Sequence, residues 1–218
     1  MSRTHAELLN RLLTDRLVAI LRVDDPDLVV DLCEAIAAGG IRSMEITMTV
    51  PNALELLRTV REKLSDDILL GAGTILDATT ARLAILAGAD FLVSPHTDAE
   101  IIRTAKRYGK PSCPGAFTPT EILQAWELGA DIVKLFPSDP IGPQYLKNVR
   151  GPLPQIRLMP TGGVTLDTIH SFFQAGACAV GIGSVLCRSG WLKAGNWQAI
   201  TDESRKYVEV VQSLFPAS

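Results

Sequence analysis

A lysine in the middle of an apolar, strand-length segment is the residue with the clearest chemical potential in this sequence. Lys134 lies within Asp131–Pro137, a run that follows Gly129-Ala130 and ends in a proline. A strand that is apolar on both faces is typical of a parallel sheet covered by helices, where desolvation disfavours a charged ammonium group. A lysine in such a place can attack a ketone and form a Schiff base. The alternative is a lysine whose stem is buried and whose ammonium group reaches solvent.

A carboxylate is expected to face the same interior as this lysine. By the two-residue period of a strand, Glu45, Thr47 and Thr49 share one face of the segment Met44–Thr49. If that face and Lys134 point into one interior, Glu45 can act as a general acid and base beside the amine. The alternative is a structural ion pair between the two side chains, which also occurs in buried networks.

Two glycine-containing loops late in the chain indicate an anion site. Thr161–Val164 and Gly181–Ser184 each follow or end an apolar run. Glycines let backbone N–H groups approach an anion, and barrels often hold a phosphate in the loops after strands 7 and 8. A tight turn is the alternative for either loop alone. The candidate phosphate-binding residues are Gly162, Gly163, Gly183 and Ser184.

Small residues and prolines end three further strands. These ends are Gly71–Thr74, Ser94–His96 and Cys113–Gly115. Such residues keep space open and hold the backbone near a ligand, although each is also a common turn-former.

A repeated unit must position these residues. A short apolar strand leads to a loop, a helical pattern and a glycine that ends the helix. The expected strands are 17–22, 41–47, 68–71, 91–94, 111–114, 131–136, 156–159 and 178–183. The expected helices are 25–38, 51–63, 77–87, 97–108, 118–128, 141–149, 165–175 and 196–214, preceded by a short amphipathic helix over 3–14 that caps one end. Predicted N-caps include Asp77, Thr97, Thr118 and Thr165.

Eight such units suit either an open doubly wound sheet or a closed barrel. No strand is followed by a GxGxxG fingerprint, and polar residues gather at the C-terminal ends of many strands. We therefore predict a single-domain (β/α)8 TIM barrel over residues 1–218 with a short N-terminal capping helix.

Composition narrows the functional classes. The chain has 218 residues, of which 47% are hydrophobic and 21% charged, with a net charge of -3 and no basic stripe of the kind that binds nucleic acid. No apolar run is long enough to span a membrane, and the N-terminus does not resemble a signal peptide, so we expect a cytoplasmic protein with no membrane partner. The four cysteines lack CxxC spacing, and with three histidines they give little material for a metal site.

Taken together, the motifs resemble those of the 2-keto-3-deoxy-6-phosphogluconate and 4-hydroxy-2-oxoglutarate aldolase family of class I pyruvate aldolases. The resemblance extends from about Leu17 to Leu186. It is carried by Gly39-Gly40-Ile41 with Glu45-Ile46-Thr47, Gly71–Leu76, Val93-Ser94-Pro95, Pro114–Glu121, Lys134–Pro137 and Pro160–Val164.

The resemblance implies a role for each of these residues. Lys134 would form the Schiff base and Glu45 would be the general acid and base, while Thr74, Pro95 and Phe136 would line the pyruvoyl pocket. The glycine loops would hold the phosphate. No cofactor is implied, because the imine takes the place of a metal, and the expected assembly is a homotrimer.

Three positions depart from the common family pattern. Thr49 stands where many members have the arginine that binds the substrate carboxylate. Our candidate replacement is Arg22 at the end of the first strand, with Thr47, Thr49 and Thr74 as further substrate-binding hydroxyl donors beside it. His96 stands where glycine is common, and Ile182 replaces the first glycine of a Gly-Gly-Ser run.

The expected activity is cleavage of 2-keto-3-deoxy-6-phosphogluconate to pyruvate and glyceraldehyde 3-phosphate, as in the Entner–Doudoroff route of carbohydrate metabolism, and also of 4-hydroxy-2-oxoglutarate. The alternatives are an aldolase for the galactonate-derived epimer, which the stretch Phe136–Tyr145 also resembles, a sugar-phosphate isomerase or epimerase, and a barrel that binds a sugar acid without catalysis.

Overall fold

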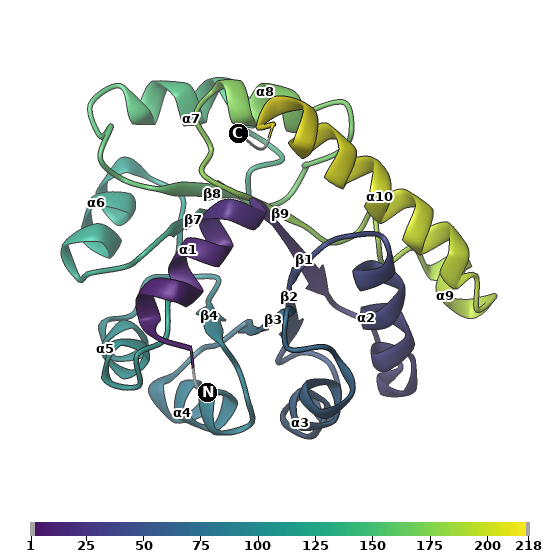
Figure 1. The fold of residues 1–218 in the computed structure, drawn as a ribbon. Helices are drawn as coiled ribbons and strands as arrows, with labels where there is room; N and C mark the ends of the chain where they lie inside the picture. Colours follow the sequence, from purple (N-terminus) through teal and green to yellow (C-terminus); the bar gives the residue numbers. More distant parts are fainter. Residues whose placement is uncertain (1–2, 217–218) are drawn as a thin grey trace.

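Parallel strands alternate with helices around one interior in the computed structural model, which describes residues 3–216 (Figure 1). Six strands form one sheet in the order β5-β4-β3-β2-β1-β9, and three form a second in the order β6-β7-β8. All of their pairings are parallel. The strands are β1 Leu17–Leu21, β2 Ser43–Thr47, β3 Leu69–Gly73, β4 Phe91–Val93, β5 Ser112–Cys113, β6 Gly115–Ala116, β7 Val133–Leu135, β8 Leu158–Pro160 and β9 Val180–Ile182.

The predicted fifth strand, 111–114, is observed as the shorter β5, and the unpredicted strand β6 follows it directly in a separate sheet. Pro114 separates β5 from β6, and proline has no N–H to give to a ladder. Its carbonyl still accepts a hydrogen bond from the Lys134 amide at 2.9 Å, so the curved surface continues across the break. At the other junction, a single bridge between Thr161 and Gly181 joins the end of β8 to β9. The observed pairing is thus a curled parallel sheet in two parts, rather than the eight uninterrupted strands that were predicted.

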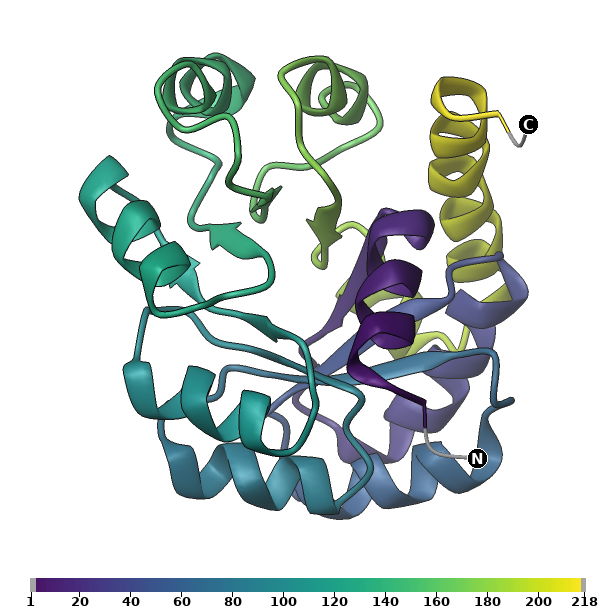
Figure 2. The same cartoon turned by 60° about the vertical axis from the view of Figure 1, so that its left-hand side comes forward.

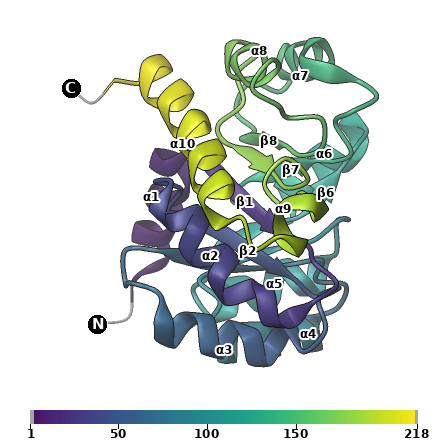
Figure 3. The ribbon, with the colours of Figure 1, turned by 90° about the vertical axis from the view of Figure 1, so that its right-hand side faces the viewer.

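Helices surround this sheet, most of them on its outside (Figures 1 and 2). They are α1 His5–Asp15, α2 Val29–Ala38 after the 3₁₀ turn η1 Pro26–Leu28, α3 Ala53–Lys63, α4 Ala78–Leu86, α5 Ala99–Arg107, α6 Pro119–Glu127, α7 Gly142–Arg150, α8 Ile169–Gln174, α9 Ser189–Lys193 and α10 Trp197–Leu214. The long helix α10 packs along α2 (Figure 3), where the Thr201 hydroxyl donates to the Ala35 carbonyl at 2.9 Å. None of these described helices is long and apolar enough to cross a membrane.

Helix starts agree with the predicted caps at two places and differ at two. Asp77 caps α4, and Thr118 forms a capping box with Glu121 at α6. Asp98, not Thr97, caps α5, because the Thr97 hydroxyl instead donates to the Gly115 carbonyl. Helix α8 begins at Ile169 rather than near Thr165.

Two separate apolar cores flank the strands. The larger core fills the space between the strands and the surrounding helices. The smaller core fills one end of the interior, where Leu8 and Leu12 of α1 pack with Phe91, Cys113 and Met159. Both leucines are buried, so α1 closes the end of the interior from which the strands start. The predicted N-terminal capping helix is therefore present.

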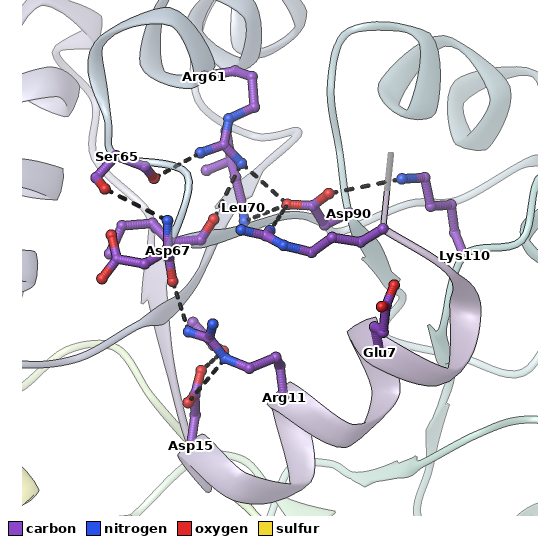
Figure 4. A network of polar contacts seen from close by, with 12 residues as sticks. Glu7, Arg11, Asp15, Arg61, Ser65, Asp67, Leu70, Asp90 and Lys110 are labelled. Carbon is purple, nitrogen blue, oxygen red and sulfur yellow. Dashed lines mark hydrogen bonds and ion pairs between the residues drawn. The ribbon is translucent and has the colours of Figure 1, made fainter. Parts of the chain in front are cut away.

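Polar contacts fasten α1 and the residues just before it to the chain around them (Figure 4). The Asp90 carboxylate lies 3.1 Å from Arg61 and 3.7 Å from both Arg3 and Lys110. The Arg11 guanidinium of α1 donates to the Asp67 carbonyl at 2.7 Å. Arg11 thus joins α1 to the segment before β3, and Arg3 joins the start of the chain to the segment before β4.

Candidate active site

Lys134 lies on β7 at the base of a cavity of ≈ 300 Å³. Its side chain is only 5% exposed, and its Nζ lies 4.8 Å from the centroid of the Phe136 ring. The ring face offers a cation a favourable contact but no hydrogen bond. A buried amine that faces an open cavity can reach a ligand carbonyl there.

The cavity collects residues from the C-terminal ends of β1, β7, β8 and β9. The sequence-predicted residues that line it are Arg22, Lys134, Phe136, Gly162, Gly163, Gly183 and Ser184. Thr49, Thr74 and Pro95 do not line it, although they follow β2, β3 and β4 at the same end of the sheet. Glu45 does not line it either, because its side chain is buried on β2.

Glu45 on β2 is buried with both carboxylate oxygens unpartnered by residues 3–216. A Cβ on Gly73 would lie 2.6 Å from its Oε1, so the carboxylate needs glycine at that position of β3. Burial raises the pKa of Glu45, and the charges of Lys134 and Arg22 oppose that rise. No ion pair within 4.0 Å joins Glu45 to Lys134, so the structural-pair alternative is not what these described residues form.

Arg22 follows β1 and brings a cation to the cavity wall. Its side chain is exposed, and it makes no side-chain hydrogen bond or ion pair in the part of the chain that the structure describes. Its charge also acts on the Glu45 carboxyl, which places it near the interior face of β2. An unpaired guanidinium in this position can bind an anion.

The Thr49 hydroxyl is already engaged. Thr47 donates its only hydroxyl proton to the Leu21 carbonyl at 3.1 Å, and the Thr47 and Thr49 hydroxyl oxygens lie 2.8 Å apart. Thr49 must therefore be the donor in that pair. This chain of hydroxyls ties the end of β2 to the residue before Arg22 and leaves Thr49 no proton for a ligand.

The glycine loops present free backbone donors. The amides of five residues lining the cavity donate no backbone or side-chain hydrogen bond within residues 3–216: Gly162, Gly163, Val164, Gly183 and Ser184. Gly162 and Gly163 have φ values of +96° and +68°, which side chains rarely adopt. Several unpaired N–H groups around one cavity form a site for an anion such as phosphate.

Five residues of the cavity wall were not among the predicted site residues: Ile20, Thr161, Val164, Gly181 and Cys187. The Thr161 hydroxyl is buried, has no partner within residues 3–216, and lies on the cavity wall. Thr161 directly precedes Gly162, a predicted phosphate-binding residue, and this position in the sequence could have identified it as a site residue. Cys187 donates weakly to the Ile20 carbonyl at 3.6 Å, and burial raises the pKa of its thiol.

A family model described as KDPG and KHG aldolase matches residues 8–203. The 2-dehydro-3-deoxy-6-phosphogalactonate aldolase of Escherichia coli is 34% identical over 197 residues, which cover 90% of this chain and 96% of the relative. The 2-dehydro-3-deoxy-phosphogluconate aldolase of Pseudomonas aeruginosa is 33% identical over 202 residues, which cover 89% of this chain and 88% of that relative. The solved KDPG aldolase of Legionella pneumophila, with pyruvate captured as a covalent carbinolamine, aligns with a TM-score of 0.83 at 26% identity, covering 91% of this chain and 96% of that one.

Proposed function

Because this chain belongs to the KDPG and KHG aldolase family and is an aldehyde-lyase, we propose that it cleaves 2-keto-3-deoxy-6-phosphogluconate to pyruvate and glyceraldehyde 3-phosphate. The observation that carries this proposal is the buried Lys134 amine at a cavity whose neighbouring Glu45 carboxyl is buried and unpartnered within residues 3–216. We expect 4-hydroxy-2-oxoglutarate to be cleaved by the same residues.

The first step is covalent. The Lys134 Nζ attacks the C2 ketone to give a carbinolamine, which loses water to form a protonated imine. The relative with captured pyruvate holds the first of these species. The imine withdraws electrons from the C3–C4 bond, so no metal or other cofactor is required for cleavage.

Glu45 moves the proton that cleavage requires. Directly or through one water, its carboxylate takes the C4 hydroxyl proton as C3–C4 breaks, which releases the aldehyde and leaves the enamine of pyruvate. The same carboxyl, now protonated, can return the proton to C3, and hydrolysis of the imine then frees pyruvate. Its raised pKa supports both directions, because a carboxyl that holds its proton more tightly is a better base and still a competent acid.

The two ends of the substrate are bound by different donors. We assign the substrate carboxylate to Arg22, which has no partner of its own in the described chain. The phosphate is assigned to Gly162, Gly163, Gly183 and Ser184, whose amides donate no hydrogen bond within residues 3–216. The Thr161 hydroxyl supplies a hydrogen bond to a substrate hydroxyl between these ends. Phe136 packs beside the pyruvoyl group, while Thr74 and Pro95 support the rim of the site from β3 and β4.

A second candidate is the aldolase for the galactonate-derived epimer, which differs at C4. The Escherichia coli relative at 34% identity favours it. A sugar-phosphate isomerase or epimerase would use the glycine loops to bind phosphate, but Lys134 and Glu45 would then have no catalytic role.

We further propose that the two sheets act as one closed (β/α)8 barrel and one domain, with the Pro114 break and the Thr161–Gly181 bridge at its junctions. The assembly we propose is a homotrimer, for which the exposed leucines Leu76, Leu83 and Leu86 at α4 offer an apolar contact. The proposed location is the cytoplasm, which keeps thiols reduced and suits the free cysteines.

The test is pyruvate release from the gluconate-derived and galactonate-derived substrates, each with and without the 6-phosphate. We expect release from the phosphorylated gluconate-derived compound at the highest kcat/KM. Preference for the other epimer selects the second candidate, and no release from any of the four compounds refutes the aldolase assignment.

A further inference from the structure

The loop after β8 is held by two hydroxyl groups that lie outside the cavity. The Ser138 hydroxyl donates to the Gly162 carbonyl. The Thr168 hydroxyl lies 2.8 Å from the Gly163 carbonyl and 3.4 Å from that of Thr165, so its single proton goes to Gly163. Neither Ser138 nor Thr168 lines the cavity. Two consecutive carbonyls of the loop are therefore fixed from its far side.

Fixing these carbonyls also fixes the next two amides. In a planar trans peptide the C=O and N–H bonds point in opposite directions. With the Gly162 carbonyl directed to Ser138, the Gly163 N–H points the other way, and the Gly163 carbonyl sets the Val164 N–H likewise. Both amides belong to residues that line the cavity, and neither donates to another group in residues 3–216. The carbonyls thus face away from the cavity and the N–H groups face it.

The loop needs such an anchor because its residues are conformationally free. Gly162 and Gly163 both have positive φ and no side chain to hold them. Ser138 also binds through its main chain, since its amide donates to the Thr161 carbonyl at 2.9 Å. Its side chain is fully buried, so its hydroxyl has no solvent to bind instead. Donors that are already oriented bind a ligand without a further cost of ordering.

We propose that Ser138 and Thr168 are positioning residues that aim the Gly163 and Val164 amides at the phosphate of the substrate. The proposal rests on the proposed function and deepens it. The preference for a phosphate monoester over an unphosphorylated keto acid then depends on the Ser138 and Thr168 hydroxyls, although neither hydroxyl contacts the substrate. Loss of either hydroxyl frees a peptide to rotate, which weakens phosphate binding and leaves the chemistry at Lys134 intact.

The test at Thr168 compares two variants at one partly buried position. Thr168→Val removes the hydroxyl at nearly constant shape, and Thr168→Ser keeps it. Thr168→Val removes the bond to the Gly163 carbonyl and also the acceptor of the Thr165 amide, which lies 2.9 Å away. We expect it to weaken inhibition by inorganic phosphate and to raise the KM for the phosphorylated substrate, each by about 3- to 10-fold, the usual scale of a lost neutral hydrogen bond. The unphosphorylated substrate 4-hydroxy-2-oxoglutarate should keep its native KM, and Thr168→Ser should behave as the native protein.

The test at Ser138 uses a matched buried serine. Ser138→Ala is compared with Ser204→Ala on α10, where the native hydroxyl is also fully buried but has no hydrogen-bond partner within residues 3–216. We expect weaker phosphate inhibition in Ser138→Ala alone. Trapping of pyruvate on Lys134 with borohydride should proceed at the native rate in both variants, which shows that the fold and the amine are intact.

The outcomes separate this inference from the function beneath it. Native protein that binds phosphate, with Thr168→Val and Ser138→Ala binding it equally well, overturns the positioning role alone. Native protein that shows no phosphate inhibition overturns the phosphate assignment and this inference with it. Equal rises in KM for phosphorylated and unphosphorylated substrates also contradict the inference, because they indicate a general distortion of the site.

Discussion

The Glu45 carboxyl is subject to two opposing influences. Burial favours its neutral form and is the larger effect, while the charges of Lys134 and Arg22 favour the anion. The net result is a pKa above the ordinary carboxyl value, for a group whose oxygens have no hydrogen-bond partner in residues 3–216. Such a carboxyl can exchange a proton with a substrate hydroxyl or a water in the cavity, which is the property that an acid and base in aldol cleavage needs.

Replacing Glu45 should therefore impair proton transfer more than binding. We expect Glu45→Gln to lower kcat by about 10²-fold or more, the usual contribution of a positioned acid and base. Imine trapping with pyruvate should continue more slowly. Glu62→Gln on the exposed face of α3 is the control and should leave kcat unchanged. A native kcat in Glu45→Gln would return Glu45 to a structural role.

The pH dependence of stability follows from the same carboxyl. Because the folded pKa of Glu45 is raised, the folded state favours the protonated form, and this contribution to stability is complete below the ordinary carboxyl pKa. It is lost as pH rises through the folded pKa. Glu45→Gln mimics the protonated form, so in urea unfolding it should match the native protein in acid and exceed its stability at neutral pH. Equal stability at both pH values contradicts the raised pKa.

Arg22 is expected to act on binding with little effect on stability, since it is exposed and has no ion-pair partner in the described chain. Arg22→Ala should raise KM by about 10-fold or more, because a charge-assisted hydrogen bond contributes about 1.5–3 kcal/mol. Arg82→Ala on the exposed side of α4 is the control. Thr49→Arg should partly restore binding in the Arg22→Ala background. Pyruvate bound far from Arg22 in a soaked crystal would refute the assignment.

At the scale of elements, the strands divide the interior into two parts. Their C-terminal ends carry the polar cavity, and their N-terminal ends are filled by the smaller apolar core and closed by α1. Lys134 and Glu45 lie between the two, with their stems in the packed region.

Helix α1 should accordingly contribute strongly to stability. Leu8→Ala removes a fully buried side chain from the smaller core and should lower the free energy of unfolding by about 2–5 kcal/mol. Asn10→Ala on the exposed face of the same helix should change it by less than about 0.5 kcal/mol. Denaturant unfolding measures both. A Leu8→Ala variant as stable as Asn10→Ala would mean that α1 does not support the interior.

For the whole molecule, the hydrophobic periodicity and the positions of glycine and proline in the sequence predicted the alternation of strands and helices. The same pattern predicted that Glu45 and Lys134 face one interior. It did not predict β6, because the expected strand 111–114 ended at Pro114, or the short helix α9. Thr97 and Asp98 are both residue types that can cap the N-terminus of α5. The Thr97 hydroxyl donates to the Gly115 carbonyl, so Asp98 is the cap, and the position of that carbonyl is not evident from the sequence. Likewise, Thr49 follows β2 at the end of the sheet that carries the site, but it donates its proton to Thr47, because the Thr47 proton goes to the neighbouring Leu21 carbonyl.

The net charge of the molecule determines whether the substrate is attracted by the whole protein or only by the active site. The net charge is -3, and the proposed substrate is itself an anion, so attraction must be local. Arg22, Lys134 and the unclaimed loop amides supply it within one cavity. In the proposed mechanism the Lys134 amine there becomes covalently bound to the keto acid.

Reduction of the protein with borohydride in the presence of pyruvate tests that claim most directly. Peptide mass analysis should find one modified residue, Lys134, converted to N-(1-carboxyethyl)lysine, and Lys134→Ala should take up no pyruvate and release none from substrate. Modification of another lysine, or pyruvate release by Lys134→Ala at the native rate, would contradict the account.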